Sequence, residues 1–134
     1  MTIGSDLNVE VPVSKKKILV VEDEESLLKL QSVLLTLRGY NVKGVTDGQA
    51  ALEAVVATNP DLILLDIMLP KIDGFQVCRQ VKANKATHHI PVIMLTAKKS
   101  MEDRVMGKQA GADMYITKPY KSSMVIETIQ KLLS

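Results

Sequence analysis

Cysteine, aromatic residues and long apolar runs are all scarce in this chain. The single cysteine, Cys78, cannot form an intramolecular disulfide, and its isolation is typical of a reducing compartment. Three tyrosines, one phenylalanine and no tryptophan leave the hydrophobic core to aliphatic side chains. No apolar run approaches the roughly 18 residues of a transmembrane helix, and the first residues lack the basic-then-apolar pattern of an export signal. We therefore expect a cytoplasmic protein with no membrane contact.

Neither sign of charge dominates the composition. The 17 lysines and arginines nearly balance 15 acidic residues, and the net charge of +2 favours neither a nucleic acid nor an anionic membrane as partner. A length of 134 residues suits one domain. Residues 1–14 are polar and show no helical period, so we predict a flexible N-terminal extension before one domain over residues 15–134. An edge strand through Val9, Val11 and Val13 is the alternative for the extension.

Short apolar runs alternate with helical periodicity along the rest of the chain. The runs predict buried strands at residues 18–21, 42–45, 62–65, 91–95 and 114–116. Helices are predicted over residues 27–37, from Asp47-Gly48 to Asn59-Pro60, from Asp73-Gly74 onward, over residues 100–110, and after Pro119. In the second helix we expect Ala50, Leu52, Val55 and Val56 to face the core. This alternation predicts an α/β fold: a single doubly wound (βα)5 domain whose five-stranded parallel sheet has helices on both faces.

Four of the five predicted strands are followed by polar side chains, namely Glu22-Asp23, Asp66, Thr96 and Lys118. The carboxyl ends of parallel strands meet at one edge of a sheet, where ligands bind, so we expect these side chains to lie together. Each has a structural explanation of its own. An acidic pair begins a helix, Asp66 begins a turn, Thr96 caps a helix, and Lys118 is solvated. As a group they form a specific chemical inventory of three carboxylates, one hydroxyl and one ammonium.

This inventory suits phosphoryl transfer to an aspartate. Two unit charges 4 Å apart repel by about 4 kcal/mol at an effective dielectric near 20, and a divalent cation relieves that repulsion. Mg²⁺ fits best because it accepts few carboxylates and completes its coordination with water and phosphate oxygens. His88 and His89 lie in a loop where we expect them to face solvent, away from any zinc site. Asp66 is then the predicted nucleophile, with Lys118 and Thr96 contacting the phosphoryl group.

The motifs Val-Val-Glu22-Asp23-Glu24, Leu-Leu-Asp66-Ile-Met-Leu-Pro70, Met-Leu-Thr96-Ala97 and Thr-Lys118-Pro119 resemble those of bacterial two-component response-regulator receiver domains. The resemblance spans about residues 17–133 and is to chemotaxis-regulator-like members. It implies a strand order of 2-1-3-4-5 and a cis peptide bond before Pro119. It also implies a signalling protein and not an enzyme with a separate substrate, since its only reactions are its own phosphorylation and dephosphorylation.

The resemblance implies a role for each matching residue. Asp66 would be the phosphoacceptor, and Asp23 and Asp66 would bind Mg²⁺ directly, with Mn²⁺ as the alternative ion. The backbone carbonyl of Met68 would be a further ligand, and Glu22 would hold a metal-bound water. Thr96 and Lys118 would bind the phosphoryl group. Tyr115 would be the aromatic switch residue, whose ring turns inward when Thr96 moves toward the phosphoryl oxygen.

The implied partners are a histidine kinase or a histidine phosphotransfer protein as phosphoryl donor, and an unknown protein downstream. We expect no direct contact with nucleic acid, because no DNA-binding segment follows the last helix. Glu102-Asp103-Arg104 and Gly111-Ala112-Asp113 resemble the subfamily that dimerises through the fourth helix, fifth strand and fifth helix. Met114 replaces a common acidic residue of that interface, and the fifth helix has no arginine. We therefore expect a monomer, with a phosphorylation-dependent dimer as the alternative.

Other interpretations of the same residues differ in what they require. A haloacid-dehalogenase-like phosphatase needs a second aspartate two residues after Asp66, where this chain has Met68. A flavodoxin-like electron carrier needs a phosphate-cradling loop and flanking aromatics, and Glu22-Asp23 would repel a phosphate there. A phosphorylation-independent docking domain and a receiver fragment excised from a larger regulator are the remaining alternatives.

Overall fold

The computed structural model describes residues 15–134, so the predictions for residues 1–14 lie outside the described residues. Strands and helices alternate throughout that range. The strands are β1 (Lys17–Val21), β2 (Asn41–Val45), β3 (Leu62–Leu65), β4 (Val92–Thr96) and β5 (Met114–Thr117). The helices are α1 (Glu25–Leu37), α2 (Gly48–Thr58), α3 (Gly74–Ala83), α4 (Met101–Gln109) and α5 (Ser122–Leu133). Among these helices, none combines the length and apolarity needed to cross a bilayer.

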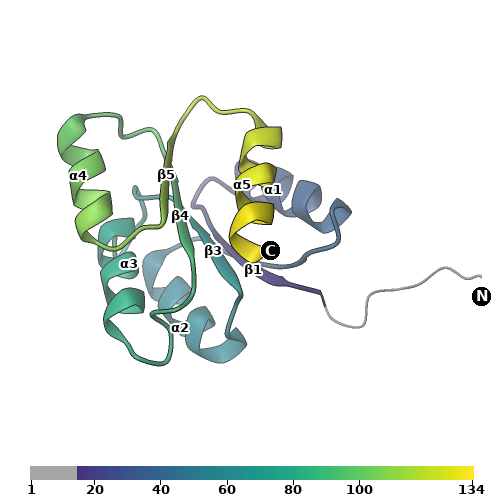
Figure 1. Cartoon of the computed structure of the whole chain (residues 1–134), viewed down its shortest axis with the longest axis horizontal. Coiled ribbons are helices and arrows are strands. Elements are labelled where there is room, and N and C mark those ends of the chain that lie inside the picture. The colour runs from purple at the N-terminus through teal and green to yellow at the C-terminus, as the bar shows by residue number, and fades with distance from the viewer. Residues whose placement is uncertain (1–14) are drawn as a thin grey trace, which may run out of the picture.

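The five strands form one parallel sheet in the order β2-β1-β3-β4-β5, which confirms the predicted fold class and strand order. Figure 1 shows α1 and α5 on one side of this sheet and α2, α3 and α4 on the other. Strands covered on both faces need apolar side chains pointing in both directions. The sequence Leu62-Ile63-Leu64-Leu65 of the central strand β3 meets this need, and all four residues are buried.

Alternation along the strands divides the core into two apolar layers. Leu19, Val21, Ile63, Leu65 and Met94 pack with the buried faces of α2 and α3. Their neighbours in the strands point the opposite way and pack with Leu35 of α1 and with Val125, Ile126 and Ile129 of α5. The two layers cover both faces of the sheet, so each loop at its carboxyl edge begins and ends in a packed element.

Capping side chains define where three of the helices begin. Asp47 and Asp73 accept hydrogen bonds from the backbone N–H groups of the third residues of α2 and α3, at 2.7 Å and 3.0 Å. The Asp-Gly pairs had predicted the starts of these two helices. The cap of α4 is Ser100, whose hydroxyl accepts from the Asp103 N–H at 3.0 Å. Thr96 therefore does not cap a helix, and its hydroxyl is available for another role.

The structure corrects two details of the sequence interpretation. Val56 was predicted to face the core, but its side chain is 77% exposed. Ala51, Ala54 and Val55 supply the buried face of α2, and the residue after Val55 points away from the sheet because a helix turns by about 100° per residue. Strand β4 begins at Val92 and not at residue 91, because a proline has no N–H to give to the ladder. His88 and His89 are exposed, as predicted.

Candidate functional site

Adjacent strands bring the acidic residues together at the carboxyl edge of the sheet. Val21 is the register partner of Leu65, so Glu22 and Asp66 leave neighbouring strands at the same level. The Asp66 N–H donates to the Val21 carbonyl at 3.0 Å, and the Glu22 N–H donates to the Val45 carbonyl at 3.1 Å. These backbone hydrogen bonds fix the starting points of both side chains.

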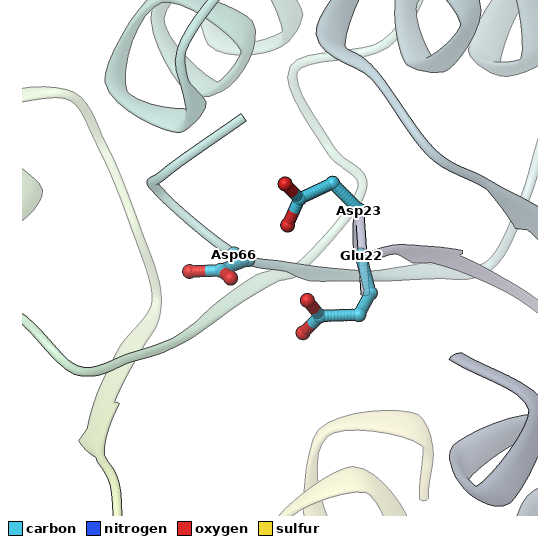
Figure 2. Close-up of side chains that lie close together, drawn as sticks. All are labelled: Glu22, Asp23 and Asp66. Atoms are coloured by element: carbon cyan, nitrogen blue, oxygen red, sulfur yellow. The ribbon is translucent and has the colours of Figure 1, made fainter. Parts of the chain in front are cut away.

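Three carboxylates converge at this edge. Glu22, Asp23 and Asp66 each offer an oxygen within 4.8 Å of the other two. Figure 2 shows the three side chains projecting into the same space, with Glu22 and Asp23 coming from the end of β1 and Asp66 from the end of β3. Glu22 and Asp66 are buried, whereas Asp23 is exposed, so the cluster opens to solvent on the side of Asp23.

The carboxylate of Asp66 is held in a fixed orientation. Its Oδ1 accepts hydrogen bonds from the backbone N–H groups of Ile67 at 2.7 Å and Met68 at 3.4 Å. Its Oδ2 lies 3.7 Å from the ammonium of Lys118. The loop can curl closely around Asp66 only because Gly74 begins α3: a Cβ at that position would clash with the Asp66 carbonyl and with Cα of Ile67.

Lys118 lies over the carboxylates from the end of β5. Its Nζ is 3.6 Å from Glu22 Oε1 and 3.7 Å from Asp66 Oδ2, so one ammonium bridges two buried carboxylates. Partial burial alone would lower the pKa of Lys118, but the two carboxylates outweigh that effect and raise it above its usual value. The backbone N–H of Lys118 donates to the Thr96 carbonyl at 2.8 Å, and the Lys118–Pro119 peptide bond is cis, as predicted.

Burial governs the protonation of Glu22. Loss of solvation raises the pKa of this carboxyl above its usual value, although the Glu24 N–H donates to Oε2 at 3.2 Å and opposes the shift. The negative charges of Asp66 and Asp23 raise the pKa further, while the ammonium of Lys118 lowers it. The site thus concentrates negative charge that a cation would relieve. The contact between Glu22 and Lys118 was not predicted from the sequence, which assigned Lys118 to the phosphoryl group.

Thr96 and Tyr115 occupy the neighbouring strand ends. Thr96 is fully buried, and its hydroxyl accepts a hydrogen bond from the Lys98 N–H at 3.3 Å, which leaves its own proton free to donate. The hydroxyl of Tyr115 donates to the Lys98 carbonyl at 2.8 Å. The Tyr115 ring packs against Gly107 of α4, where a Cβ would stand only 2.6 Å from the ring. Lys98 therefore forms hydrogen bonds with both residues that the family resemblance predicts to act as a switch.

The donors at this edge fit a hard divalent cation. Glu22, Asp23 and Asp66 supply only carboxylate oxygens, the ligands that Mg²⁺ prefers. Neither histidine belongs to this cluster of the described residues, and the buried Cys78 lies in the core with a pKa raised by burial to about 11. An exposed Asp23 beside two buried carboxylates leaves one side open for water and for an incoming phosphate group. The set is therefore suited to magnesium and unsuited to zinc.

Comparisons with known proteins agree on one family. Residues 18–130 match the family described as "Response regulator receiver domain". Among curated proteins, the chain is 45% identical over 118 residues to the alkaline phosphatase synthesis transcriptional regulatory protein PhoP of Bacillus subtilis, covering 88% of this chain and 48% of that protein. It is 44% identical over 116 residues to the sensory transduction protein RegX3 of Mycobacterium tuberculosis, covering 87% of this chain and 50% of that one.

A solved structure gives the same relationship. The chemotaxis response regulator CheY4 of Vibrio cholerae superposes with a TM-score of 0.83 at 30% identity, covering 90% of this chain and all of the other. The chain thus spans about half the length of the curated relatives named above and the whole length of the CheY4 chain.

Proposed function

Because the chain belongs to the response regulator receiver domain family and has its phosphoacceptor signalling role, we propose that Asp66 is the residue that accepts the phosphoryl group. The observation that carries the proposal is the convergence of Asp66 with Glu22, Asp23 and Lys118 at one sheet edge. Among the three carboxylates, Asp66 alone accepts from two backbone N–H groups at one oxygen while the ammonium lies within 4 Å of the other. The carboxylate is thus oriented before any phosphoryl donor arrives.

The transfer follows from this arrangement. A carboxylate oxygen of Asp66 forms a P–O bond as the P–N bond of a phosphohistidine breaks, and the departing imidazole nitrogen keeps the electron pair. Lys118, already between Glu22 and Asp66, stabilises the negative charge on the phosphoryl oxygens. The Thr96 hydroxyl donates a hydrogen bond to one of them. Water later hydrolyses the aspartyl phosphate, which releases inorganic phosphate and returns Asp66 to its carboxylate form.

We propose further that Asp23 and Asp66 ligate Mg²⁺ directly, that the Met68 carbonyl is a third ligand, and that Glu22 holds a bound water. When bound, the ion would neutralise charge on the carboxylates and on the phosphoryl oxygens. The mutual distance of at most 4.8 Å among the three carboxylates supports a shared cation. The role of the Met68 carbonyl rests on the resemblance to the family, because Met68 stands two residues after the proposed phosphoacceptor. Mn²⁺ prefers the same oxygen donors and is the alternative.

The proposed signal is a rearrangement around Thr96 and Tyr115. A phosphoryl group adds a charge of about −1.5 to −2 beside Lys118 and Thr96. Movement of Thr96 toward it would disturb its hydrogen bond with the Lys98 N–H, and with it the Tyr115 contact to the Lys98 carbonyl. Reversing a 1:99 population to 99:1 requires about 5.5 kcal/mol of differential stabilisation, which several charge-assisted hydrogen bonds supply. The responding surface would be α4, β5 and α5.

The donor in this proposal is a histidine kinase or a histidine phosphotransfer protein. The output passes through a downstream protein, with no direct contact to nucleic acid by residues 15–134 themselves. The curated relatives named above include a transcriptional regulatory protein, and this chain matches about half of its length. We expect the isolated chain to be a monomer in the cytoplasm, a location that its single cysteine favours. A phosphorylation-dependent dimer remains the alternative.

Incubation with acetyl phosphate and Mg²⁺, followed by intact-mass measurement, tests the assignment of Asp66. The wild type should gain one phosphoryl group, and Asp66→Asn should gain none, because an amide is a far weaker nucleophile than a carboxylate. Asp61→Asn is the matched control. Asp61 lies just before β3, at the edge of the sheet opposite to Asp66, and its carboxylate accepts a hydrogen bond from the Lys17 N–H at 2.7 Å.

The control should take up phosphate as the wild type does, and a chelator should abolish uptake in both. Equal uptake by Asp66→Asn and wild type would overturn the assignment of the phosphoacceptor. Full uptake in the presence of chelator would overturn the proposed metal site.

A further inference from the structure

A buried glutamine connects α1 to the segment that carries Lys118. Gln31 lies in the middle of α1 with only 9% of its surface exposed, and its Nε2 donates to the Tyr120 hydroxyl at 3.1 Å. Tyr120 follows Lys118 by two residues and precedes α5. In Figure 1, α1 and α5 lie side by side on one face of the sheet. The hydrogen bond therefore joins residues 89 positions apart across this helix pair.

A glutamine is an unexpected residue in these surroundings. The cleft between α1 and α5 is lined mostly by aliphatic side chains, among them Leu27, Leu34, Leu35, Leu64, Leu95 and Ile126. Gln31 Oε1 has no hydrogen-bond partner within residues 15–134. Exchanging the two ends of the amide would only move the unpaired position to the nitrogen. A buried polar group satisfied at one end is less favourable for stability than an apolar side chain of the same size. Stability alone therefore does not account for this side chain.

Gln31 provides a hydrogen bond to the segment between β5 and α5, residues 118–121. The upstream end of that segment is fixed by the hydrogen bond from the Lys118 N–H to the Thr96 carbonyl at 2.8 Å. The downstream end is fixed by Tyr120, whose ring packs on the α1–α5 layer of the core and whose hydroxyl is held by Gln31. Lys118 thus forms the first attachment with its own backbone and lies two residues before the second, with Nζ 3.6 Å from Glu22 and 3.7 Å from Asp66.

We propose that Gln31 is a positioning residue for phosphoryl transfer, which acts by holding Tyr120 and thereby the Lys118 ammonium beside Asp66. The inference rests on the proposed role of Lys118 at the phosphoryl group. Gln31 itself touches neither the carboxylates nor the phosphoryl group. Loss of the hydrogen bond releases the downstream attachment, and Lys118 then spends less time in the position where it stabilises the transferred group.

Two conservative variants remove the hydrogen bond while preserving volume: Gln31→Met and Tyr120→Phe. The rate of phosphoryl uptake from acetyl phosphate at saturating Mg²⁺ should fall about fivefold in each, the factor that corresponds to about 1 kcal/mol for one hydrogen bond. The double variant should be no slower than either single variant, because both substitutions remove the same interaction. Tyr120→Phe keeps the aromatic ring in the core, so it still measures the effect of the lost hydrogen bond if Gln31→Met fails to fold.

The matched control is Thr87→Val. Thr87 is also buried, and its hydroxyl donates to the Val81 carbonyl at 2.7 Å, but it lies before β4 at the opposite edge of the sheet. Its loss should reduce stability without changing the uptake rate. A second readout is Mg²⁺ affinity, measured by NMR titration. This affinity should not fall in the Gln31 and Tyr120 variants, because Lys118 is not a metal ligand and a displaced ammonium repels the ion less.

Three outcomes would overturn the inference: uptake at the wild-type rate in both single variants, rate losses that multiply in the double variant, or a parallel fall in Mg²⁺ affinity. The last would indicate general disruption and not positioning. Phosphate uptake by Asp66→Asn in the same assay would instead contradict the proposed function, so the two failures are distinguishable.

Discussion

Replacing Asp66 with asparagine should stabilise the metal-free protein, although the residue replaced is the centre of the site. Asparagine is close in shape to aspartate, and its side-chain carbonyl oxygen retains an acceptor for the Ile67 and Met68 N–H groups. The substitution therefore removes one negative charge and little else. Its effect on the free energy of unfolding measures how strongly the three carboxylates repel one another.

The magnitude follows from the distances. At an effective dielectric of 20, Asp66 is repelled by about 3.5 kcal/mol from each carboxylate at the outer limit of 4.8 Å. The attraction to the Lys118 ammonium at 3.7 Å is about 4.5 kcal/mol on the same scale. The two repulsions exceed the one attraction by about 2.5 kcal/mol, and solvent around the exposed Asp23 reduces that figure. We expect a gain of about 1–2 kcal/mol, or roughly 4–8 °C in the melting temperature.

Urea unfolding at neutral pH in the presence of a chelator measures this gain, with Asp61→Asn as the control for loss of an aspartate outside the cluster. Addition of Mg²⁺ should then stabilise the wild type more than Asp66→Asn, because the variant has lost one of the proposed ligands. The reasoning is refuted if Asp66→Asn is less stable than wild type without metal. That result would mean that the pairing with Lys118 outweighs the repulsion and that the cluster has no need of a cation.

Two further predictions concern parts of the fold away from the site. Lys82→Met should lower the free energy of unfolding in urea by about 1–3 kcal/mol without changing phosphoryl uptake. The Lys82 ammonium lies 3.0 Å from Asp113 and also donates hydrogen bonds to two backbone carbonyls. A fall in uptake would contradict this prediction. The Ala50 N–H, and to a lesser extent Lys71, hold the pKa of Asp47 below its usual value. The resulting stabilisation is complete above the unfolded pKa of about 3.9 and is lost as the pH falls through the folded-state value. As the pH falls below about 4, urea midpoints of the wild type should therefore fall more steeply than those of Asp47→Asn. Parallel curves would exclude this cap as the cause.

The sheet was predictable because its strands are buried on both faces. A run such as Leu62–Leu65 has few alternatives to a central parallel strand, and the polar residue that follows it marks the edge where the chain leaves the core. The carboxyl ends of parallel strands share one edge, so the meeting of Glu22, Asp23 and Asp66 could be expected before any coordinates.

Contacts between side chains of distant elements were less predictable. The ion pair between Lys118 and Glu22 depends on how far along the sheet β5 and β1 end relative to one another. The spacing of residues in the sequence does not specify this. The pairing of Gln31 with Tyr120 depends on how α1 and α5 pack. One signal was available: Gln31 interrupts an otherwise leucine-rich face of α1, and a polar residue there needs a partner.

The face of a helix was also difficult to assign where apolar residues surround it. Val55 and Val56 are chemically identical, yet the first is 2% exposed and the second 77%. Only the rotation of α2 on the sheet separates them, and that rotation is set by the small residues Ala51 and Ala54 against the strands. The periodicity of α2 alone does not distinguish the two valines.

Chemical trapping of the phosphoaspartate tests the central claim most directly. Borohydride reduces an aspartyl phosphate to homoserine, which marks the phosphorylated position irreversibly. After reaction with acetyl phosphate and Mg²⁺, reduction and peptide sequencing by mass spectrometry, we predict homoserine at position 66 and an unmodified aspartate at position 23. Homoserine at any other aspartate, or none at position 66 in a protein that has taken up phosphate, would contradict the account.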